Sequence, residues 1–97
     1  MKMTKVNKAV AKIQKAIGEL DKAIITKDTK VLSVSSVSQL SKFKEAFFVI
    51  LETIKSDNIP PKNERIISIS RIIVDQWPFY LELGNIIIDA EQAYKEI

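Results

Sequence analysis

Apolar residues near the start of the chain recur at heptad spacing, and this pattern constrains the fold more than any other feature. Between about Thr4 and Thr26 they are separated by alternating steps of four and three residues: Val6, Val10, Ile13, Ile17, Leu20 and Ile24. A β-strand, whose side chains alternate with a period of two, cannot place these residues on one face, whereas a helix can. The spacing therefore predicts a helix over residues 4–26. Gly18 inside it costs about 1 kcal/mol relative to alanine, which predicts a close contact there.

The middle of the chain predicts a second helix. Ser36 and Gln39 fit a capping box, in which each side chain bonds the backbone N–H of the other residue. The apolar stripe that follows contains three of the four phenylalanines and predicts a helix over residues 36–55. Residues 28–35 are interpreted either as a loop or as an early start of this helix, capped by Asp28.

Two more helices are expected after the Pro60–Pro61 pair, which forbids helix just before it. Asn63 is a candidate N-cap for a helix over 63–76, whose apolar positions are Ile66, Ile69, Ile73 and Trp77. Residues 78–96 carry a second heptad pattern: Phe79, Leu83, Ile86, Ala90, Ala93 and Ile97. Pro78 either separates these two helices or kinks a single one. We therefore predict an all-α domain over residues 1–97, a compact antiparallel bundle of four helices (4–26, 36–55, 63–76 and 78–96), or three if Pro78 only kinks the last.

Composition excludes several classes of chemistry. The 97 residues include neither cysteine nor histidine, which removes disulfides, thiolate metal sites and every nucleophile system that needs a histidine base. We expect no enzyme activity, no catalytic residue, no cofactor and no metal. No apolar run approaches the roughly 18–20 residues that span a bilayer, and the N-terminus does not resemble a signal peptide. A cytoplasmic protein is the default expectation.

Charge is distributed unevenly. Residues 1–30 contain eight lysines and three acidic residues, a net charge of +5, while residues 31–97 carry a net charge of −2. The candidate binding lysines lie on one face of the first predicted helix: Lys5, Lys8, Lys12 and Lys15. Such a face is most often simply solvated; the alternatives are contact with an acidic protein, with nucleic acid or with an anionic membrane surface. The absence of arginine from this segment removes bidentate phosphate recognition.

Two further features allow both a functional and a structural interpretation. Trp77 and Tyr80, beside Phe79 and Pro78, are candidate anchors for a partner because tryptophan and tyrosine are enriched in binding hot spots; filling the end of the bundle is the commoner role. Acidic residues seven positions apart mark the last helix: Glu82, Asp89 and Glu96. We interpret them as a solvated face, or as partners of the lysine face within one molecule or between two.

The function expected from these features is binding. In size, absence of cysteine, lysine content and expected bundle architecture, the chain is similar to the small immunity proteins that protect bacteria from their own bacteriocins. This likeness implies a microbial or phage-type protein that binds a protein partner as an immunity, inhibitor, adaptor or assembly factor, and it assigns no residue a role. The two heptad patterns either face the chain's own core or pair with a second copy. The candidate partner-binding residues are Lys5, Lys8, Lys12, Lys15, Trp77 and Tyr80.

Overall fold

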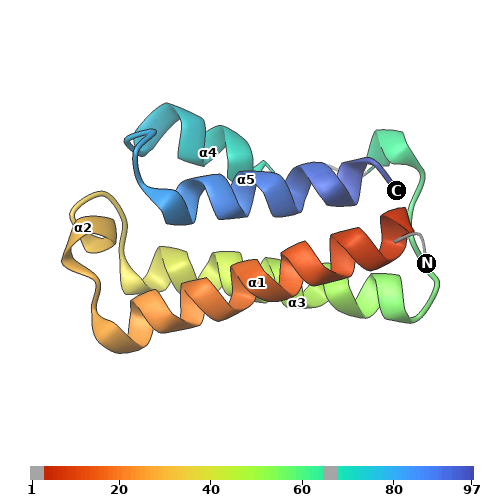
Figure 1. The fold of residues 1–97 in the computed structure, drawn as a ribbon, viewed down its shortest axis with the longest axis horizontal. Coiled ribbons are helices and arrows are strands. Elements are labelled where there is room, and N and C mark those ends of the chain that lie inside the picture. Colours follow the sequence, from red (N-terminus) through yellow and green to blue (C-terminus); the bar gives the residue numbers. More distant parts are fainter. Residues whose placement is uncertain (1–3, 65–67) are drawn as a thin grey trace.

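The computed structural model describes residues 4–64 and 68–97, which form helices joined by short connections (Figure 1). The helices are α1 (Lys5–Thr26), α2 (Thr29–Leu32), α3 (Val37–Lys55), α4 (Ile69–Gln76) and α5 (Glu82–Lys95), with a 3₁₀ turn at Lys62–Glu64. Helix α1 runs opposite to both α3 and α5, and α4 runs opposite to α5 (Figure 1). The radius of gyration is 13.3 Å, close to the roughly 13 Å of a compact chain of this length. The prediction of an all-α bundle is confirmed.

Helix α1 packs against both α3 and α5, and its alanines make this possible. Ala9, Ala16 and Ala23 are buried, as are Ile13 and Leu20 between them. The remaining apolar residues of the heptad pattern are half-buried or, at Val6, 37% exposed. The buried face is therefore centred on the alanines, whose small side chains let two helices approach α1 closely.

The starts of α1 and α3 follow the expected capping chemistry. The hydroxyl of Thr4 accepts a hydrogen bond from the Asn7 amide, and that of Ser36 accepts one from the Gln39 amide, each at 3.0 Å. The reciprocal half of the predicted capping box is not formed, because the Gln39 side chain instead accepts a hydrogen bond from the Ser35 hydroxyl. Ser36 nevertheless caps α3, and the predicted range of this helix is confirmed.

The structure of residues 28–35 is neither a loop throughout nor an early start of the second helix. Asp28 does act as a cap, since its carboxylate accepts hydrogen bonds from the amides of Lys30 and Val31. The helix that it caps, however, is the single turn α2, which ends before Ser33 and is separate from α3. Lys27 precedes it in the left-handed conformation (φ 51°) and ends α1.

The third helix is shorter than predicted. Helix α4 begins at Ile69, and Asn63 lies inside the 3₁₀ turn instead of capping a helix. Ser68 has a φ of 63°, which a right-handed helix cannot include, so the prediction of helix from residue 63 is wrong. Ile66, which carried part of the predicted pattern, lies outside the described residues.

Pro78 separates two helices. The residue before a proline is driven out of the helical region, and Trp77 accordingly has extended dihedral angles (φ −102°, ψ 143°) and ends α4. Helix α5 begins at Glu82 and not at Pro78, because residues 78–81 form a turn in which the Leu81 amide bonds the Pro78 carbonyl at 3.1 Å. The four-helix alternative is therefore correct, with a later start for the last helix.

The close contact expected at Gly18 is found at the other glycine. Gly18 is exposed, and a Cβ atom there would have no neighbour within 4 Å in the part of the chain that the structure describes. At Gly84, an added Cβ would lie 2.9 Å from Cγ2 of Ile73 and 3.4 Å from Cε3 of Trp77. The absence of a side chain at Gly84 therefore lets α5 pack directly against α4. Among the helices in the described ranges, none has a stretch both long enough and apolar enough to span a membrane.

Candidate functional site

The connection between α4 and α5 presents two aromatic side chains to solvent. Phe79 is 90% exposed and Tyr80 is 73% exposed. Their rings lie edge to face, with centroids 6.3 Å apart. Among the described residues Phe79 is the most exposed of the large apolar side chains. We call these two residues the aromatic pair.

The backbone that carries the aromatic pair is held on both sides. Trp77 and Leu81 flank the pair and are both buried in the core. Trp77 packs against Phe43 of α3, with ring centroids 6.4 Å apart. The Asn85 side-chain amide donates a hydrogen bond to the Phe79 carbonyl at 3.3 Å. The backbone that presents the aromatic pair is thus constrained on both sides.

The sequence-based hypothesis for this corner is corrected by the burial of Trp77. Only 5% of Trp77 is exposed, so it fills the end of the bundle, and Tyr80 alone of the two candidates is accessible. Phe79 belongs to the aromatic cluster identified in the sequence but is not among the candidate binding residues, and the heptad pattern of the last helix, which it also fits, predicts its burial. The signal that could have found it is Pro78, since a turn there takes Phe79 out of helical register.

Each ring of the aromatic pair borders a different depression. Phe79 lines a small pocket of about 120 Å³ between α4 and α5. Among the described residues that line it, Asn85 is the only one with a polar side-chain amide, and the others are Ile73, Val74, Trp77, Pro78, Phe79, Leu81, Gly84 and Ile88. We call this the apolar pocket. An apolar cavity of about 150 Å³ accommodates benzene, so this pocket matches one apolar side chain.

Tyr80 lines a wider and more polar depression, which we call the lysine groove. Its volume is about 610 Å³, and α1, α2 and the start of α5 enclose it. Lys15, Lys22 and Lys30 line it together with three carboxylate residues, Glu19, Asp28 and Glu82. Its apolar lining residues are Ala23, Val31, Leu81, Leu83 and Ile86. The fold therefore brings Lys15 and Tyr80, predicted on separate grounds, to one groove.

The remaining predicted lysines lie elsewhere. Lys5 and Lys8 are exposed in the first turns of α1, at the opposite end of this helix from the α4–α5 connection (Figure 1). Lys12 lies between these ends, and its ammonium is 4.0 Å from the Asp89 carboxylate of α5. This contact is the pairing of the lysine face with the acidic face within one molecule. Of the four predicted lysines, only Lys15 therefore lines the lysine groove.

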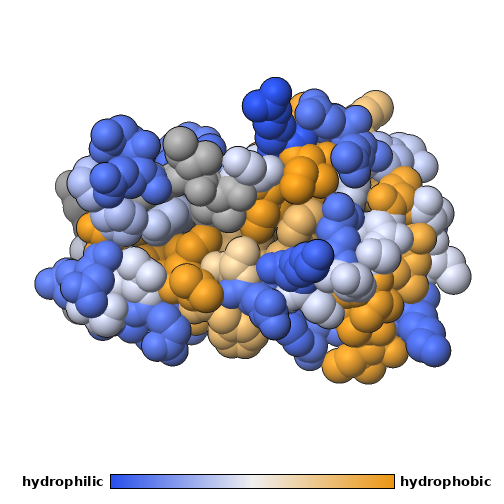
Figure 2. All heavy atoms as spheres, turned by 180° about the vertical axis from the view of Figure 1, so that it is seen from behind, coloured by the Kyte–Doolittle hydropathy of each residue, from blue (hydrophilic) through white to orange (hydrophobic). Residues whose placement is uncertain are grey.

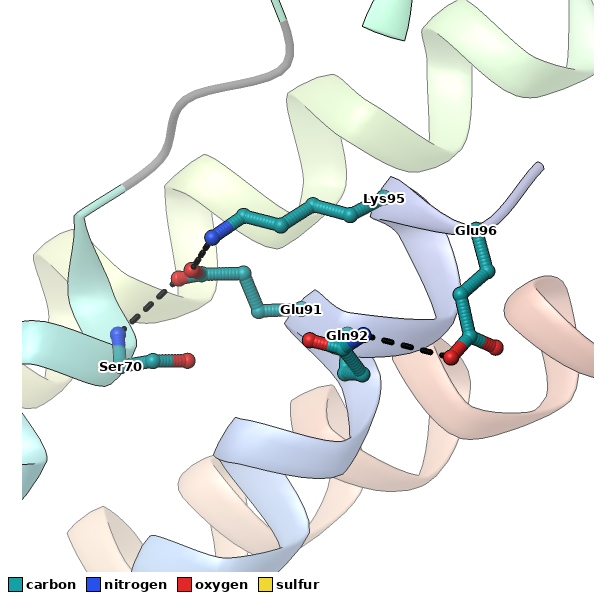
Figure 3. Close-up of polar contacts among 5 residues, drawn as sticks. All are labelled: Ser70, Glu91, Gln92, Lys95 and Glu96. Carbon is teal, nitrogen blue, oxygen red and sulfur yellow. Dashed lines mark hydrogen bonds and ion pairs between the residues drawn. The ribbon is translucent and has the colours of Figure 1, made fainter.

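Glu91 differs from the other acidic residues of α5. It is 2% exposed, whereas Glu82, Asp89 and Glu96 are exposed. Figure 3 shows that each of its carboxylate oxygens has a partner. One accepts a hydrogen bond from the Ser70 amide at 3.0 Å, and the other lies 2.9 Å from the Lys95 ammonium. The signal in the sequence is that Glu91 shares a helical face with Ile87 and Tyr94, both buried. Its contacts make it a structural residue.

Other exposed apolar side chains are distributed over the surface. On the face drawn in Figure 2, apolar residues reach the surface in several patches among charged ones. Phe48 and Val49, adjacent on α3, are 46% and 65% exposed. In the part of the chain that the structure describes, no group of three or more acidic side chains is placed to hold a metal ion.

Comparison with known proteins adds no family to this description. A scan against models of known protein families gives no match, and a search of curated proteins gives no significant sequence match.

Proposed function

We propose that this chain is a non-enzymatic binding protein that recognises a protein partner through the aromatic pair. The observation that supports this is the 90% and 73% exposure of Phe79 and Tyr80 on a turn whose neighbours, Trp77 and Leu81, are buried. Leaving two large aromatic side chains in water forgoes about 1.5–3 kcal/mol of burial energy for each apolar side chain. Burial against a partner would recover that energy, and aromatic side chains of this kind dominate interface energetics.

The surroundings of the aromatic pair suit a protein partner. An apolar pocket beside Phe79 and a polar groove beside Tyr80 give an apolar centre with a polar rim, which is the usual anatomy of such interfaces. Nucleic-acid or membrane binding through the lysine face has less support. The Asp89 carboxylate lies beside Lys12 and would repel phosphate groups approaching the middle of that face.

Selection of short peptides from a random display library tests this proposal. We expect selected peptides to bind the unaltered chain and to lose binding to a Phe79→Ser/Tyr80→Ser double variant. The matched control is Phe48→Ser/Val49→Ser, which alters an adjacent pair of exposed apolar residues on α3 and should keep binding. If the selected peptides bind the Phe79→Ser/Tyr80→Ser variant as well as the unaltered chain, the aromatic pair is not the site.

A further inference from the structure

We infer that the partner presents an acidic segment carrying an apolar side chain, which enters the apolar pocket while its carboxylates meet the lysine groove. This inference rests on the proposed function, because it assumes that the aromatic pair is the binding site. It goes further by assigning the chemistry of the partner. Three properties of the site support it: the two depressions adjoin, one selects an apolar group, and the other favours negative charge.

The two depressions adjoin at the turn that carries the aromatic pair. Leu81 lines both of them, with Phe79 on the side of the apolar pocket and Tyr80 on the side of the lysine groove. A short extended or helical segment lying across the turn would therefore contact both rings and both depressions. This arrangement favours a segment whose apolar and charged residues are close together in sequence.

The apolar pocket selects a single uncharged side chain. Asn85, its only described lining residue with a side-chain amide, is already a donor to the Phe79 carbonyl at 3.3 Å. A charged group placed there would lose its hydration without gaining a partner of opposite charge. The lack of a side chain at Gly84, where a Cβ would lie 2.9 Å from Ile73, lets the α4 and α5 sides of the pocket lie close together.

The lysine groove is lined by three lysines and three carboxylate residues, but these charged groups differ in whether another group of the protein already contacts them. Lys15, Lys22 and Lys30 have no carboxylate within 4.0 Å among the described residues. Asp28, in contrast, accepts hydrogen bonds from two amides of α2, and Glu82 lies in the first turn of α5, where the helix dipole offsets its charge.

The third carboxylate of the groove, Glu19, opposes part of this positive charge. It lies four residues after Lys15 and three before Lys22 on the same face of α1, but it forms no ion pair with either lysine among the described residues. With Asp28 bonded to amides and Glu82 at a helix start, three ammonium groups face one unengaged carboxylate, which leaves an excess of positive charge for a ligand. The aliphatic stems of these lysines and the apolar lining of the groove suit a segment in which acidic residues alternate with apolar ones.

The peptide selection described above tests this inference when a charge-reversed variant is added. The variant is Lys15→Glu/Lys22→Glu/Lys30→Glu, and its matched control is Lys42→Glu/Lys55→Glu/Lys62→Glu, which changes the net charge equally at exposed positions outside the groove. Circular dichroism and thermal unfolding verify that both variants fold. We expect selected peptides to be enriched in aspartate, glutamate and large apolar residues. We also expect the groove variant to weaken their binding about tenfold or more, and the control variant to change it by less than about threefold.

The outcomes separate this inference from the proposed function. If the binding of the selected peptides depends on Phe79 and Tyr80 but the peptides are not acidic, the inference is wrong and the proposed function stands. The same holds if the peptides bind the groove variant as tightly as the unaltered chain. Peptides that do not depend on the aromatic pair would overturn both. A fluorescent single-stranded oligonucleotide serves as a further probe. If the unaltered chain binds it more tightly than the acidic peptides, and the groove variant does not bind it, the groove lysines bind nucleic acid and the inference is wrong.

Discussion

The amide of Ser70 donates a hydrogen bond to the Glu91 carboxylate, 3.0 Å away, so that a side chain of α5 caps the start of α4 (Figure 3). Helix α4 needs such a cap, because Ser68, the residue before it, has left-handed dihedral angles and makes no side-chain capping hydrogen bond. The Lys95 ammonium, 2.9 Å from the other oxygen, compensates the buried charge. One carboxylate therefore links two helices and fixes where the shorter one begins.

Replacing Glu91 is expected to destabilise the fold. Glu91→Ala leaves the Ser70 amide without its acceptor and opens a cavity, which should lower the free energy of unfolding by about 2–4 kcal/mol. Glu91→Gln keeps an oxygen for Ser70 and loses only the ion pair with the partly exposed Lys95, so about 1 kcal/mol is expected. Urea denaturation measures both. Equal losses for the two variants would show that the charge, and not the cap, is what matters.

The two glycines should respond to alanine in opposite directions. At Gly84 the new Cβ would lie 2.9 Å from a methyl group of Ile73, and we expect overpacking of about 1–3 kcal/mol to exceed the roughly 1 kcal/mol gain in helix propensity. Gly18→Ala is the matched control, since it meets nothing within 4 Å among the described residues and should stabilise the fold by about 1 kcal/mol. Thermal unfolding distinguishes the two, and stabilisation by both would mean that α4 and α5 have room to separate.

Helix type and the order of the helices could be predicted from this sequence, since heptad spacing fixes them locally. The centre of the buried face on α1 could not. The pattern of larger residues pointed to Val6 through Ile24, but α1 lies against two helices at once, and Ala9, Ala16 and Ala23 are the residues that allow this. Which face is buried depends on how many neighbours a helix has, and periodicity does not contain that information.

The start of α4 is a second feature that could not be predicted from the sequence. Ile66, Ile69 and Ile73 have helical spacing, so local pattern extended the helix to residue 63. Its start is instead set by Ser68 and by the carboxylate of Glu91, twenty-one residues away from Ser70. A helix boundary that is determined by a hydrogen bond to a residue distant in sequence cannot be predicted from the local spacing of apolar residues.

Only part of the candidate site could be predicted, because the rest depends on contacts between segments that are distant in sequence. Lys15 and Tyr80 were identified from charge and from aromatic clustering, and the fold places both in the lysine groove. Lys22 and Lys30 belong to the same groove but were not singled out, because only the folded chain brings α2 beside the start of α5. Trp77 was selected for its residue type, which is equally typical of a core.

Lys27 offers a test of backbone strain. It ends α1 with a φ of 51°, and its amide bonds carbonyl oxygens of the last turn, a position where glycine is the usual residue. Lys27→Gly should raise the free energy of unfolding by about 0.5–1 kcal/mol, the relief of strain exceeding the added entropy of the unfolded chain. Lys22→Gly, in the exposed interior of α1, should lower it by about 1 kcal/mol. Destabilisation by both substitutions, measured in urea, would contradict the left-handed conformation of Lys27.

Trp77 should tolerate phenylalanine far better than alanine. Its indole nitrogen is buried and has no hydrogen-bond partner among residues 4–64 and 68–97, so Trp77→Phe removes an unsatisfied donor while keeping an aromatic ring beside Phe43. We expect a loss of about 1 kcal/mol or less for Trp77→Phe and about 3–5 kcal/mol for Trp77→Ala. Similar large losses for both variants in urea denaturation would indicate that the indole N–H does have an acceptor in solution.

Phe79 and Tyr80 should be dispensable for stability, in contrast to Trp77. Each is largely exposed, so replacing either with serine removes little buried surface, and the free energy of unfolding should change by no more than about 0.5 kcal/mol. Urea denaturation of Phe79→Ser and Tyr80→Ser, compared with Trp77→Ala, gives the measurement. If serine at either position costs as much as a core substitution, its exposure has a structural cause, and the main support for a binding role of the aromatic pair is removed. Unchanged stability is the outcome that the proposed binding role of the aromatic pair requires.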